Sequence, residues 1–412
     1  MMKKIGLVSL CLLWVGGVSA AVDNKQQESI DRGEYIAFAG DCNACHTVEQ
    51  GDKYAGGYAF PTPFGVVFST NITPNKEHGI GNYSYQDFVR VMREGVAPGG
   101  TLYPAMPFTS YHYVTDADLE DLWSYLQSIP PSDKPNLENT MIFPANIRLG
   151  LKVWNFMFLN TDEFVENKDK SAEWNRGAYL IKGLAHCGEC HTPRNIAMAS
   201  DESKTLMGGP LGSINAPNIT PLELKKQGWT RESLVDLFHQ GHSSQGVVNH
   251  DMLEVVSNSL SHLTIEDLDA VATYLLDSSD ATLQERINVA KLTNTEEKSG
   301  KKLFTLNCGG CHGLNGEGSA VAPALNTNAT VKATDPTNLI AFILKGIPKS
   351  YLTLLPMPSH SQTLSDAQIV EVVNYVRLTW GQNERIDVDT VAKIRKRLEK
   401  MDAIKPYPET TE

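Results

Sequence analysis

The sequence is short of positive charge, has few cysteines and has no long apolar run beyond its first residues. Against 48 Asp and Glu it has only 36 Lys and Arg, which gives a formal net charge of −12. A nucleic-acid-binding protein needs a basic face, so this class of partner is excluded. After residue 21 no stretch approaches the roughly 18 apolar residues of a membrane-spanning helix. The 412 residues, 41% of them hydrophobic, suffice for about two to four folded domains.

The first 21 residues have the composition of an export signal. Lys3 and Lys4 precede an apolar core over residues 5–17, and small residues then lead up to Ala21. This order predicts a signal peptide over residues 1–21 that is cleaved at Ala21. An uncleaved anchor is the alternative, but the apolar core is shorter than the about 20 residues that a span requires. We therefore expect an exported chain.

Six of the seven cysteines occur in three pairs, and a histidine directly follows each pair. Two thiols spaced Cys-x-x-Cys on one helical turn can add to the two vinyl groups of a haem, and the next imidazole then reaches the iron. The sequence therefore predicts three covalently bound haems c. They are attached through Cys42, Cys45 and His46, through Cys187, Cys190 and His191, and through Cys308, Cys311 and His312.

Other uses of paired cysteines account less well for this pattern. A redox-active dithiol does not require a histidine after each pair. A zinc ribbon would combine two pairs on one ion and would leave the third pair over. A disulfide between cysteines this close in the sequence is strained. Covalent haem explains all six cysteines at once.

The segments around the three motifs repeat one another. A helical segment with a glycine precedes each motif, and a capped helical segment with a tyrosine ten residues beyond the cap follows it. These repeats predict a mostly α-helical chain of three tandem domains of the class I cytochrome c type, at residues 22–130, 173–278 and 299–381. Residues 131–172 and 279–298 are then linkers, and residues 382–412 a C-terminal tail. The repeated positions are Gly33, Gly177 and Gly300, then Thr115, Thr264 and Ser365, then Tyr125, Tyr274 and Tyr375.

A methionine precedes each closing helix and is the expected second protein ligand of each iron. Methionine sulfur opposite histidine stabilises reduced iron and raises the reduction potential. The candidates are Met106, Met252 and Met357, two of which lie between or beside prolines that stiffen their loops. His250 is an alternative ligand in the second unit, with Met207 a more distant third choice, and His360 is a weaker alternative in the third unit.

A second repeated feature connects the first two units. An Asn-Ile-Thr-Pro segment follows each of the first two proximal histidines at nearly the same spacing. Amide and hydroxyl groups can donate hydrogen bonds to haem propionates, so these loops are expected to contact haem; an ordinary turn is the alternative. The predicted contact residues are Asn71 and Thr73, Asn218 and Thr220, and in the divergent third unit Pro323.

Two segments outside the repeats are candidates for surface roles. Residues 141–159 are rich in aromatic residues and either pack between domains or present apolar surface to a partner or membrane; we favour packing. Residues 386–401 alternate apolar and basic residues at helical spacing. Such a helix either lies on a membrane surface or is a solvated final helix.

Almost the whole mature chain resembles the three-haem cytochrome c subunit of bacterial membrane-bound dehydrogenases, the family that serves gluconate 2-dehydrogenase and quinohaemoprotein alcohol dehydrogenase. The most specific stretches are residues 101–111 (TLYPAMPFTSY), 171–195, 216–221 (APNITP) and 229–234 (WTRESL). The resemblance implies a separate large catalytic subunit with flavin, pyrroloquinoline quinone or molybdenum, and allows for a small third subunit. It also implies that the haems pass electrons to ubiquinone, with the chain peripheral on the periplasmic face of the cytoplasmic membrane.

The sequence itself contains no centre that would oxidise a substrate. It has no flavin fingerprint, no molybdenum site and no paired-carboxylate or serine constellation, so no catalytic residue is predicted. The expected role is electron transfer within an oxidoreductase complex that oxidises a sugar acid, alcohol or aldehyde. The alternatives are the cytochrome partner of a molybdenum-hydroxylase-type dehydrogenase and, less favoured, a multi-haem peroxidase with one open iron position.

Overall fold

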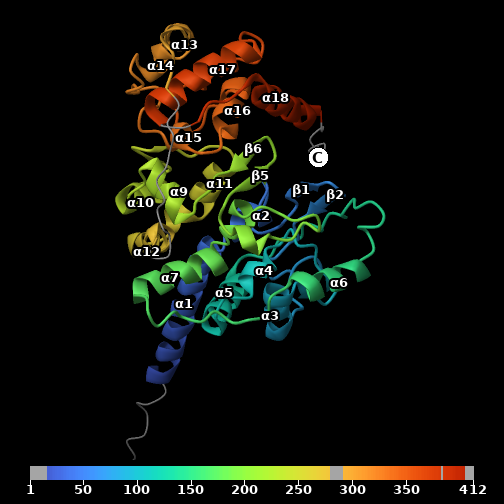
Figure 1. The fold of residues 1–412 in the computed structure, drawn as a ribbon. Coiled ribbons are helices and arrows are strands. Elements are labelled where there is room, and N and C mark those ends of the chain that lie inside the picture. The colour runs from blue at the N-terminus through green and yellow to red at the C-terminus, as the bar shows by residue number, and fades with distance from the viewer. Residues whose placement is uncertain (1–15, 279–290, 382–383, 404–412) are drawn as a thin grey trace, which may run out of the picture.

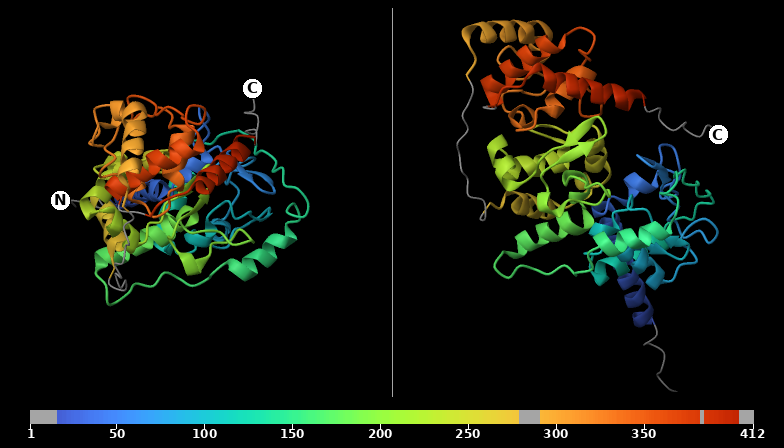
Figure 2. Two further views of the ribbon diagram at one scale, coloured as in Figure 1. Left: turned by 45° about the horizontal axis from the view of Figure 1, so that its top comes forward. Right: turned by 45° about the vertical axis from the view of Figure 1, so that its right-hand side comes forward.

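About half of the described residues are helical and few are in strands, in agreement with the mostly α-helical fold that the sequence predicts. The computed structural model describes residues 16–278, 291–381 and 384–403. Three helical units follow one another, with the second unit between the first and the third (Figure 1). The same order is visible in the turned views of Figure 2. Within the described ranges, strands occur as four small two-stranded sheets.

Each unit is built on the same frame. An opening helix leads to a short helical turn that carries the Cys-x-x-Cys-His motif, and a closing helix packs across the opening one. The opening helices are α1 (Gly16–Ala39), α7 (Ala172–Tyr179, continued by a π-helical turn, Leu180–Leu184) and α13 (Asn294–Asn307). The motif turns are α2 (Cys42–His46), α8 (Gly188–His191) and α14 (Gly309–His312), and the closing helices are α5 (Asp116–Ser128), α12 (Ile265–Leu276) and α17 (Asp366–Val376).

The repeated glycines let these helices cross closely. A Cβ atom at Gly33 would overlap with the carbonyl oxygen of Asp121 in α5, and one at Gly177 would overlap with the carbonyl oxygen of Ala270 in α12. At Gly300 it would lie 2.5 Å from the Cβ of Tyr375. Because any larger residue would push the helices apart, the crossing requires glycine at this position.

The predicted caps begin all three closing helices. The hydroxyls of Thr115, Thr264 and Ser365 accept hydrogen bonds from the backbone three residues on. Only the third of these caps forms a reciprocal capping box, in which Gln368 accepts from the backbone N–H of Ser365. In the first two units an aspartate occupies the Gln368 position and makes contacts with a neighbouring unit instead.

Short elements complete each unit. The first contains β1 (Ala59–Thr62) and β2 (Gly65–Phe68), α3 (Tyr85–Glu94), β3 (Val96–Ala97), β4 (Gly100–Thr101) and α4 (Phe108–Tyr111). The second contains β5 (Gly209–Leu211), β6 (Ile214–Ala216), α9 (Pro221–Gln227), α10 (Arg231–Gln240), β7 (His242–Ser243), β8 (Gly246–Val247) and α11 (Asp251–Asn258), with 3₁₀ turns at Glu202–Lys204 and Leu260–His262. The third contains α15 (Ala329–Lys332), α16 (Thr337–Lys345), a π-helical turn at Arg377–Gly381 and α18 (Val388–Ala403).

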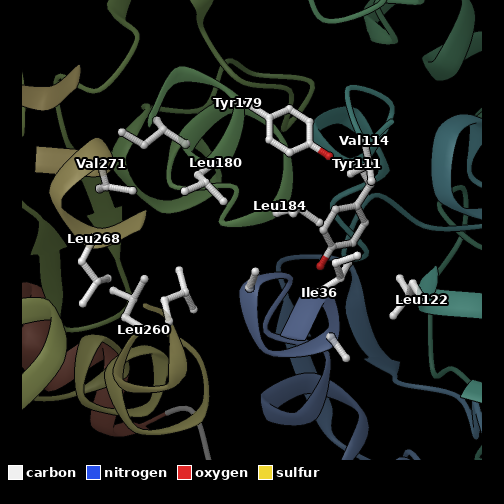
Figure 3. Close-up of a cluster of buried hydrophobic side chains, with 14 of the residues drawn as sticks. Ile36, Tyr111, Val114, Leu122, Tyr179, Leu180, Leu184, Leu260, Leu268 and Val271 are labelled. Atoms are coloured by element: carbon white, nitrogen blue, oxygen red, sulfur yellow. The ribbon is translucent and has the colours of Figure 1, made fainter. Parts of the chain in front are cut away.

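The first two units share one hydrophobic core, whereas the third has its own. The shared core joins Ile36 and Leu122 of unit one to Leu180 and Leu268 of unit two. Figure 3 shows Tyr179 of unit two beside Val114 and Tyr111 of unit one. The third core is built around Phe304, Ile340 and Ile369.

The predicted linkers are partly integral to the units. Residues 132–142 lie along unit one, where the Asn71 amide donates to the carbonyls of Ser132 and Lys134 and the Thr140 N–H donates to Val66. In the second linker, α13 already begins at Asn294, because Thr293 and Glu296 form a capping box. Residues 279–290 lie outside the described residues.

Residues 141–159 pack between units one and two on one side only, where the Trp154 indole donates to the carbonyl of Ala197 in unit two and its ring contacts Phe108 in unit one. They contain α6 (Leu149–Phe158), and no residue of this helix is fully buried. Apolar side chains of the segment point to solvent, among them Phe143 and Phe156, which are 75% and 90% exposed. The helix lies on the outer side of unit one (Figure 1).

The C-terminal helix α18 packs against unit three. The apolar residues expected to face a membrane, Val391, Ile394 and Leu398, are buried in the third core. Their burial extends unit three beyond residue 381 and covers the apolar side of the amphipathic helix. Residues 382–383 and 404–412 of the predicted tail lie outside the described residues.

Residues 1–15 of the predicted signal also lie outside the described residues, and residues 16–21 form the start of α1. Across the part of the chain that the structure describes, no helix combines the length and apolarity needed to cross a bilayer.

Candidate haem sites

Each motif turn presents its histidine in the same way. The Nδ1 atom of His46 lies 2.7 Å from the carbonyl oxygen of Thr70, that of His191 2.7 Å from Pro217, and that of His312 2.8 Å from Pro323. A carbonyl oxygen only accepts, so Nδ1 carries the proton and donates it. The lone pair that can bind iron is therefore on Nε2, with the ring held by a fixed backbone group.

Burial keeps these three imidazoles neutral. It lowers the pKa of His46, of His191 and of His312, and the hydrogen bond to the backbone carbonyl opposes it without cancelling it. A neutral imidazole with an oriented Nε2 is the form that ligates a metal. The residues present thus fit an iron ligand in all three units.

The thiols fit thioether attachment better than thiolate chemistry. Burial raises the pKa of Cys42 and of Cys187 to about 12, and that of Cys308 to about 11. A redox-active dithiol has a lowered pKa, and zinc binds thiolate. The six cysteines are unpaired, and no three His, Cys, Asp or Glu side chains of the described residues gather as a metal-binding cluster.

The repeated Asn-Ile-Thr-Pro loops lie next to the first two proximal histidines and help to orient them. In both copies the asparagine Oδ1 accepts from the N–H and hydroxyl of the threonine two residues on, within Asn71–Thr73 and within Asn218–Thr220. The residue just before the asparagine supplies the carbonyl that holds the histidine, Thr70 in unit one and Pro217 in unit two. Pro323 has this carbonyl role in unit three. Direct haem contact by these side chains stays a prediction.

The three methionines lie in different local structures but on the unit cores. Met106 lies between β4 and α4, and Met252 in the first turn of α11; both are partly buried and pack on the shared core. Met357 packs on the third core, and its backbone pairs with Ile347 through two hydrogen bonds of 2.9 and 3.0 Å. Each is thus part of the packed unit rather than exposed.

The competing histidines are engaged elsewhere. The ring of His250 stacks on Phe342 of unit three, 5.6 Å between centroids, and its Nδ1 lies 2.8 Å from the Asn249 side chain. The Nδ1 of His360 lies 3.3 Å from the Thr363 hydroxyl. These contacts favour Met252 and Met357 as the second ligands.

The first two sites face one another across the shared core. Motif turn α2 packs on α11, where Asn43 donates to Asn258, 3.0 Å apart. In the reverse direction, Thr109 of α4 donates to Glu189 in motif turn α8, 2.7 Å apart. Motif turn α2 therefore contacts the helix that contains Met252, and motif turn α8 contacts the helix that follows Met106.

The attachment points of units one and two lie near each other, since α2 contacts α11 and Thr109 of α4 donates to Glu189 of α8. Burial raises the pKa of Cys45 to about 12, and the nearby Asp41 and Cys190 of unit two add to this rise.

A reciprocal tyrosine pair between the units is absent from our sequence-based expectations. The hydroxyl of Tyr35 in α1 donates to Asp267 in α12, 2.6 Å away, and the hydroxyl of Tyr179 in α7 donates to Asp118 in α5. Each hydroxyl also accepts a backbone N–H, from Thr264 and Thr115 respectively. Tyr35 and Tyr179 occupy the same position, two residues after the repeated glycine. This shared position is the sequence feature from which the pair could have been predicted.

Comparison with known proteins agrees with these sites. The family described as cytochrome c matches residues 30–130 and 297–380. The chain is 35% identical to the fructose dehydrogenase cytochrome subunit of Gluconobacter japonicus over 406 residues, covering 90% of this chain and 84% of the relative. It is 34% identical to the gluconate 2-dehydrogenase cytochrome c subunit of Pantoea cypripedii, covering 96% of both chains. The chain belongs to the family of dehydrogenase cytochrome c subunits. It therefore binds haem c covalently and functions in electron transfer, and the resemblance seen in the sequence is confirmed.

A third relative is much longer than this chain. The chain is 37% identical to a nicotinate dehydrogenase subunit of Pseudomonas putida over 385 residues. The match covers 90% of this chain but 32% of that protein. This cytochrome thus corresponds to about one third of the length of that larger protein.

Proposed function

We propose that the chain holds three haems c and transfers electrons from a catalytic dehydrogenase subunit to ubiquinone. The observation that carries the proposal is the threefold recurrence of a Cys-x-x-Cys-His turn whose histidine Nδ1 lies 2.7–2.8 Å from a backbone carbonyl. When bound, haem iron supplies reversible one-electron chemistry. The chain contributes attachment, ligands and a fixed arrangement of the three sites.

The residues that would hold each haem follow from this arrangement. The six motif cysteines form the thioether bonds, and His46, His191 and His312 are the proximal ligands. Met106, Met252 and Met357 are the second ligands, supported by their burial on the unit cores and by the engagement of His250 and His360 elsewhere. With two protein ligands at each iron, no site keeps the open position that a peroxidase needs.

The partner in this proposal is a separate large subunit that oxidises a sugar acid, alcohol or aldehyde. The names of the fructose and gluconate 2-dehydrogenase relatives support it, since both are cytochrome subunits of dehydrogenases. That subunit would contain flavin or pyrroloquinoline quinone. A second candidate is a partner of the molybdenum-hydroxylase type. The similarity to the nicotinate dehydrogenase subunit supports only that the partner could oxidise a substrate of another class. The chain would work on the periplasmic face of the cytoplasmic membrane after export.

The haem count tests the first part of the proposal. Exported protein, extracted with acid and acetone, should keep three haems per chain by pyridine haemochrome absorbance. Cys308→Ala with Cys311→Ala should reduce this number to two while the first two remain. Loss of all haem on extraction would refute covalent attachment.

The ligand assignment is tested by redox titration. Met106→Ala should lower one midpoint potential by on the order of 100 mV and leave the other two nearly in place, because loss of the sulfur ligand destabilises reduced iron. Met207→Ala is the matched control, since Met207 is 50% exposed and has no proposed role. An unchanged set of three potentials in the Met106 variant would remove Met106 from the iron.

A further inference from the structure

The outward side of α6 is an apolar stripe. Leu149, Val153, Phe156 and Met157 are 68%, 54%, 90% and 58% exposed. Their spacing of four, seven and eight residues from Leu149 puts them on one face of the helix. A surface helix normally turns such a face to the core, so this orientation is the reverse of the usual one.

The inner side of α6 is anchored by specific contacts. The Trp154 indole donates to the carbonyl of Ala197, 2.8 Å away, and its ring meets Phe108 edge to face at 6.2 Å. The Asn155 amide donates to the carbonyl of Glu94, also at 2.8 Å. Rotating the helix to bury the stripe would break these bonds, so tertiary packing imposes its exposure.

Neighbouring segments extend the stripe. The N–H of Ile142 donates to the carbonyl of Phe64, 2.8 Å away, which brings residues 140–143 alongside the turn between β1 and β2. Phe64 is 41% exposed and Ile142 59%. The turn between β1 and β2, the connecting segment and α6 lie on the same side of unit one (Figure 1). We call this surface the apolar rim; it consists of Phe64, Ile142, Phe143, Ile147, Leu149, Val153, Phe156 and Met157.

The charge of the rim differs from that of the rest of the chain. Between Glu138 and Asp162 there is no acidic residue, although the chain has a net charge of −12. The same interval contains Arg148 and Lys152, both exposed. Glu94 lies beside the inner side of α6, where its carboxylate pairs with Arg90. An apolar segment that has basic but no acidic residues of its own is complementary to a layer of anionic headgroups.

We propose that the apolar rim docks unit one on an anionic lipid bilayer, with its apolar side chains at the boundary between headgroups and acyl chains. A protein interface has about one hydrogen bond per 100–200 Å², whereas the exposed side chains of the rim offer no donor or acceptor. Lys152 would reach headgroup phosphates while its stem stays on the apolar surface. The Arg148 guanidinium instead donates to the carbonyl of Thr101 and lies over the Tyr103 ring. This proposal rests on the proposed location at the membrane and adds which surface attaches.

The test measures binding of exported holoprotein to lipid vesicles by co-sedimentation, with haem absorbance as the readout. Vesicles of phosphatidylglycerol and phosphatidylethanolamine are compared with vesicles of phosphatidylcholine. Phe156→Ser with Met157→Ser should weaken binding to the anionic vesicles by at least about tenfold. Lys152→Gln should weaken it by about fivefold, and should have little effect on phosphatidylcholine.

The matched control is Leu222→Ser with Ile265→Ser, which removes two apolar side chains of unit two that are 45% and 49% exposed. It should bind vesicles like the parent protein. Equal binding by the rim variant and the control, or no vesicle binding by the parent protein, would overturn the proposal. So would a rim variant that binds vesicles normally but no longer co-purifies with a catalytic subunit. Haem content and midpoint potentials of the same samples test the proposed function separately.

Discussion

Units one and two form a reciprocal pair, whereas unit three uses the same frame without such a partner. Two repeated positions account for the difference. Where Tyr35 and Tyr179 follow the helix-crossing glycine in the first two units, unit three has the exposed Lys302. Where Asp118 and Asp267 accept their hydroxyls, unit three has Gln368, which completes its own capping box. Helix-surface residues, and not the frame itself, decide which units pair.

Unit three instead attaches to unit two mainly through polar loop contacts, with a few apolar ones such as Leu352 against the shared core and Phe342 against His250. Thr334 donates to Glu223 from its N–H and its hydroxyl, at 2.8 and 2.9 Å. Arg397 of α18 donates to the carbonyls of Gly212 and Ile214, at 2.8 and 2.7 Å. Such contacts orient a unit but bury less apolar surface than a shared core. We expect the first two units to unfold together and the third to unfold separately.

Substitution of the glycines at the helix crossings should cause the largest loss of stability. Gly33→Ala forces a methyl group into the α5 backbone and should cost more than about 3 kcal/mol of the stability of the paired units. Gly300→Ala should cost less, since the added carbon would lie 2.5 Å from the Tyr375 Cβ and 2.8 Å from the Glu371 carbonyl oxygen, whereas at Gly33 it would lie still closer to the Asp121 carbonyl oxygen. Thermal unfolding followed by circular dichroism measures both. Equal losses would show that the crossings are equally tight.

The tyrosine pair should have the next largest effect. Tyr35→Phe with Tyr179→Phe removes two hydrogen bonds to carboxylates, and the loss should be about 2–3 kcal/mol. Lys302→Phe, at the same register in unit three, is the control and should change stability little. Denaturant titration of the holoprotein gives both values. A tyrosine variant as stable as the parent protein would mean that the shared apolar core alone holds the pair.

Acid should weaken the same pair in a predictable direction. Burial alone would raise the pKa of Asp267, but hydrogen bonds from Arg176 and Tyr35 keep it below its ordinary value. A carboxylate with a lowered folded pKa stabilises the fold above its unfolded pKa, and this stabilisation is lost as pH falls through the lower value. Stability should therefore drop below about pH 4, and Asp267→Asn should flatten that part of the profile. Glu266→Gln, at the neighbouring exposed position of α12, is the control and should leave the profile unchanged.

The smallest effect should come from the contact between units two and three. Arg397→Ala removes bonds to two backbone carbonyls at a partly exposed site and should cost about 1 kcal/mol. Hydrogen exchange should then rise in unit three while the paired units stay protected. Lys396→Ala, next to it and exposed, should leave exchange unchanged. Faster exchange in units one and two would show that all three units are coupled.

Much of the site could be predicted because the chemistry is local in sequence. The cysteine pairs and their histidines lie on single helical turns, so their spacing in the sequence fixes the relative positions of their side chains. The caps at Thr115, Thr264 and Ser365 are equally local. The carbonyl partners of the histidines were harder to foresee, because backbone oxygens 11 to 26 residues away have no residue type to mark them.

Non-local features escaped prediction for the same reason. The amphipathic pattern of residues 386–401 is equally compatible with a membrane and with a protein core, and only the position of α16 and α17 decides that Val391 and Leu398 are buried. The apolar pattern of α6 likewise does not show which side of the helix faces unit one; the contact of Trp154 decides this.

The sequence by itself determined three attachment motifs and the helices around them, since these depend on residues a few positions apart. Tertiary structure alone decided that the first two units are a pair, that the third is attached from the side, and that an apolar stripe faces outward. These outcomes depend on which surfaces meet between residues 43 to 232 positions apart in the chain. Side-chain packing between distant helices sets that choice, and local propensity does not encode it.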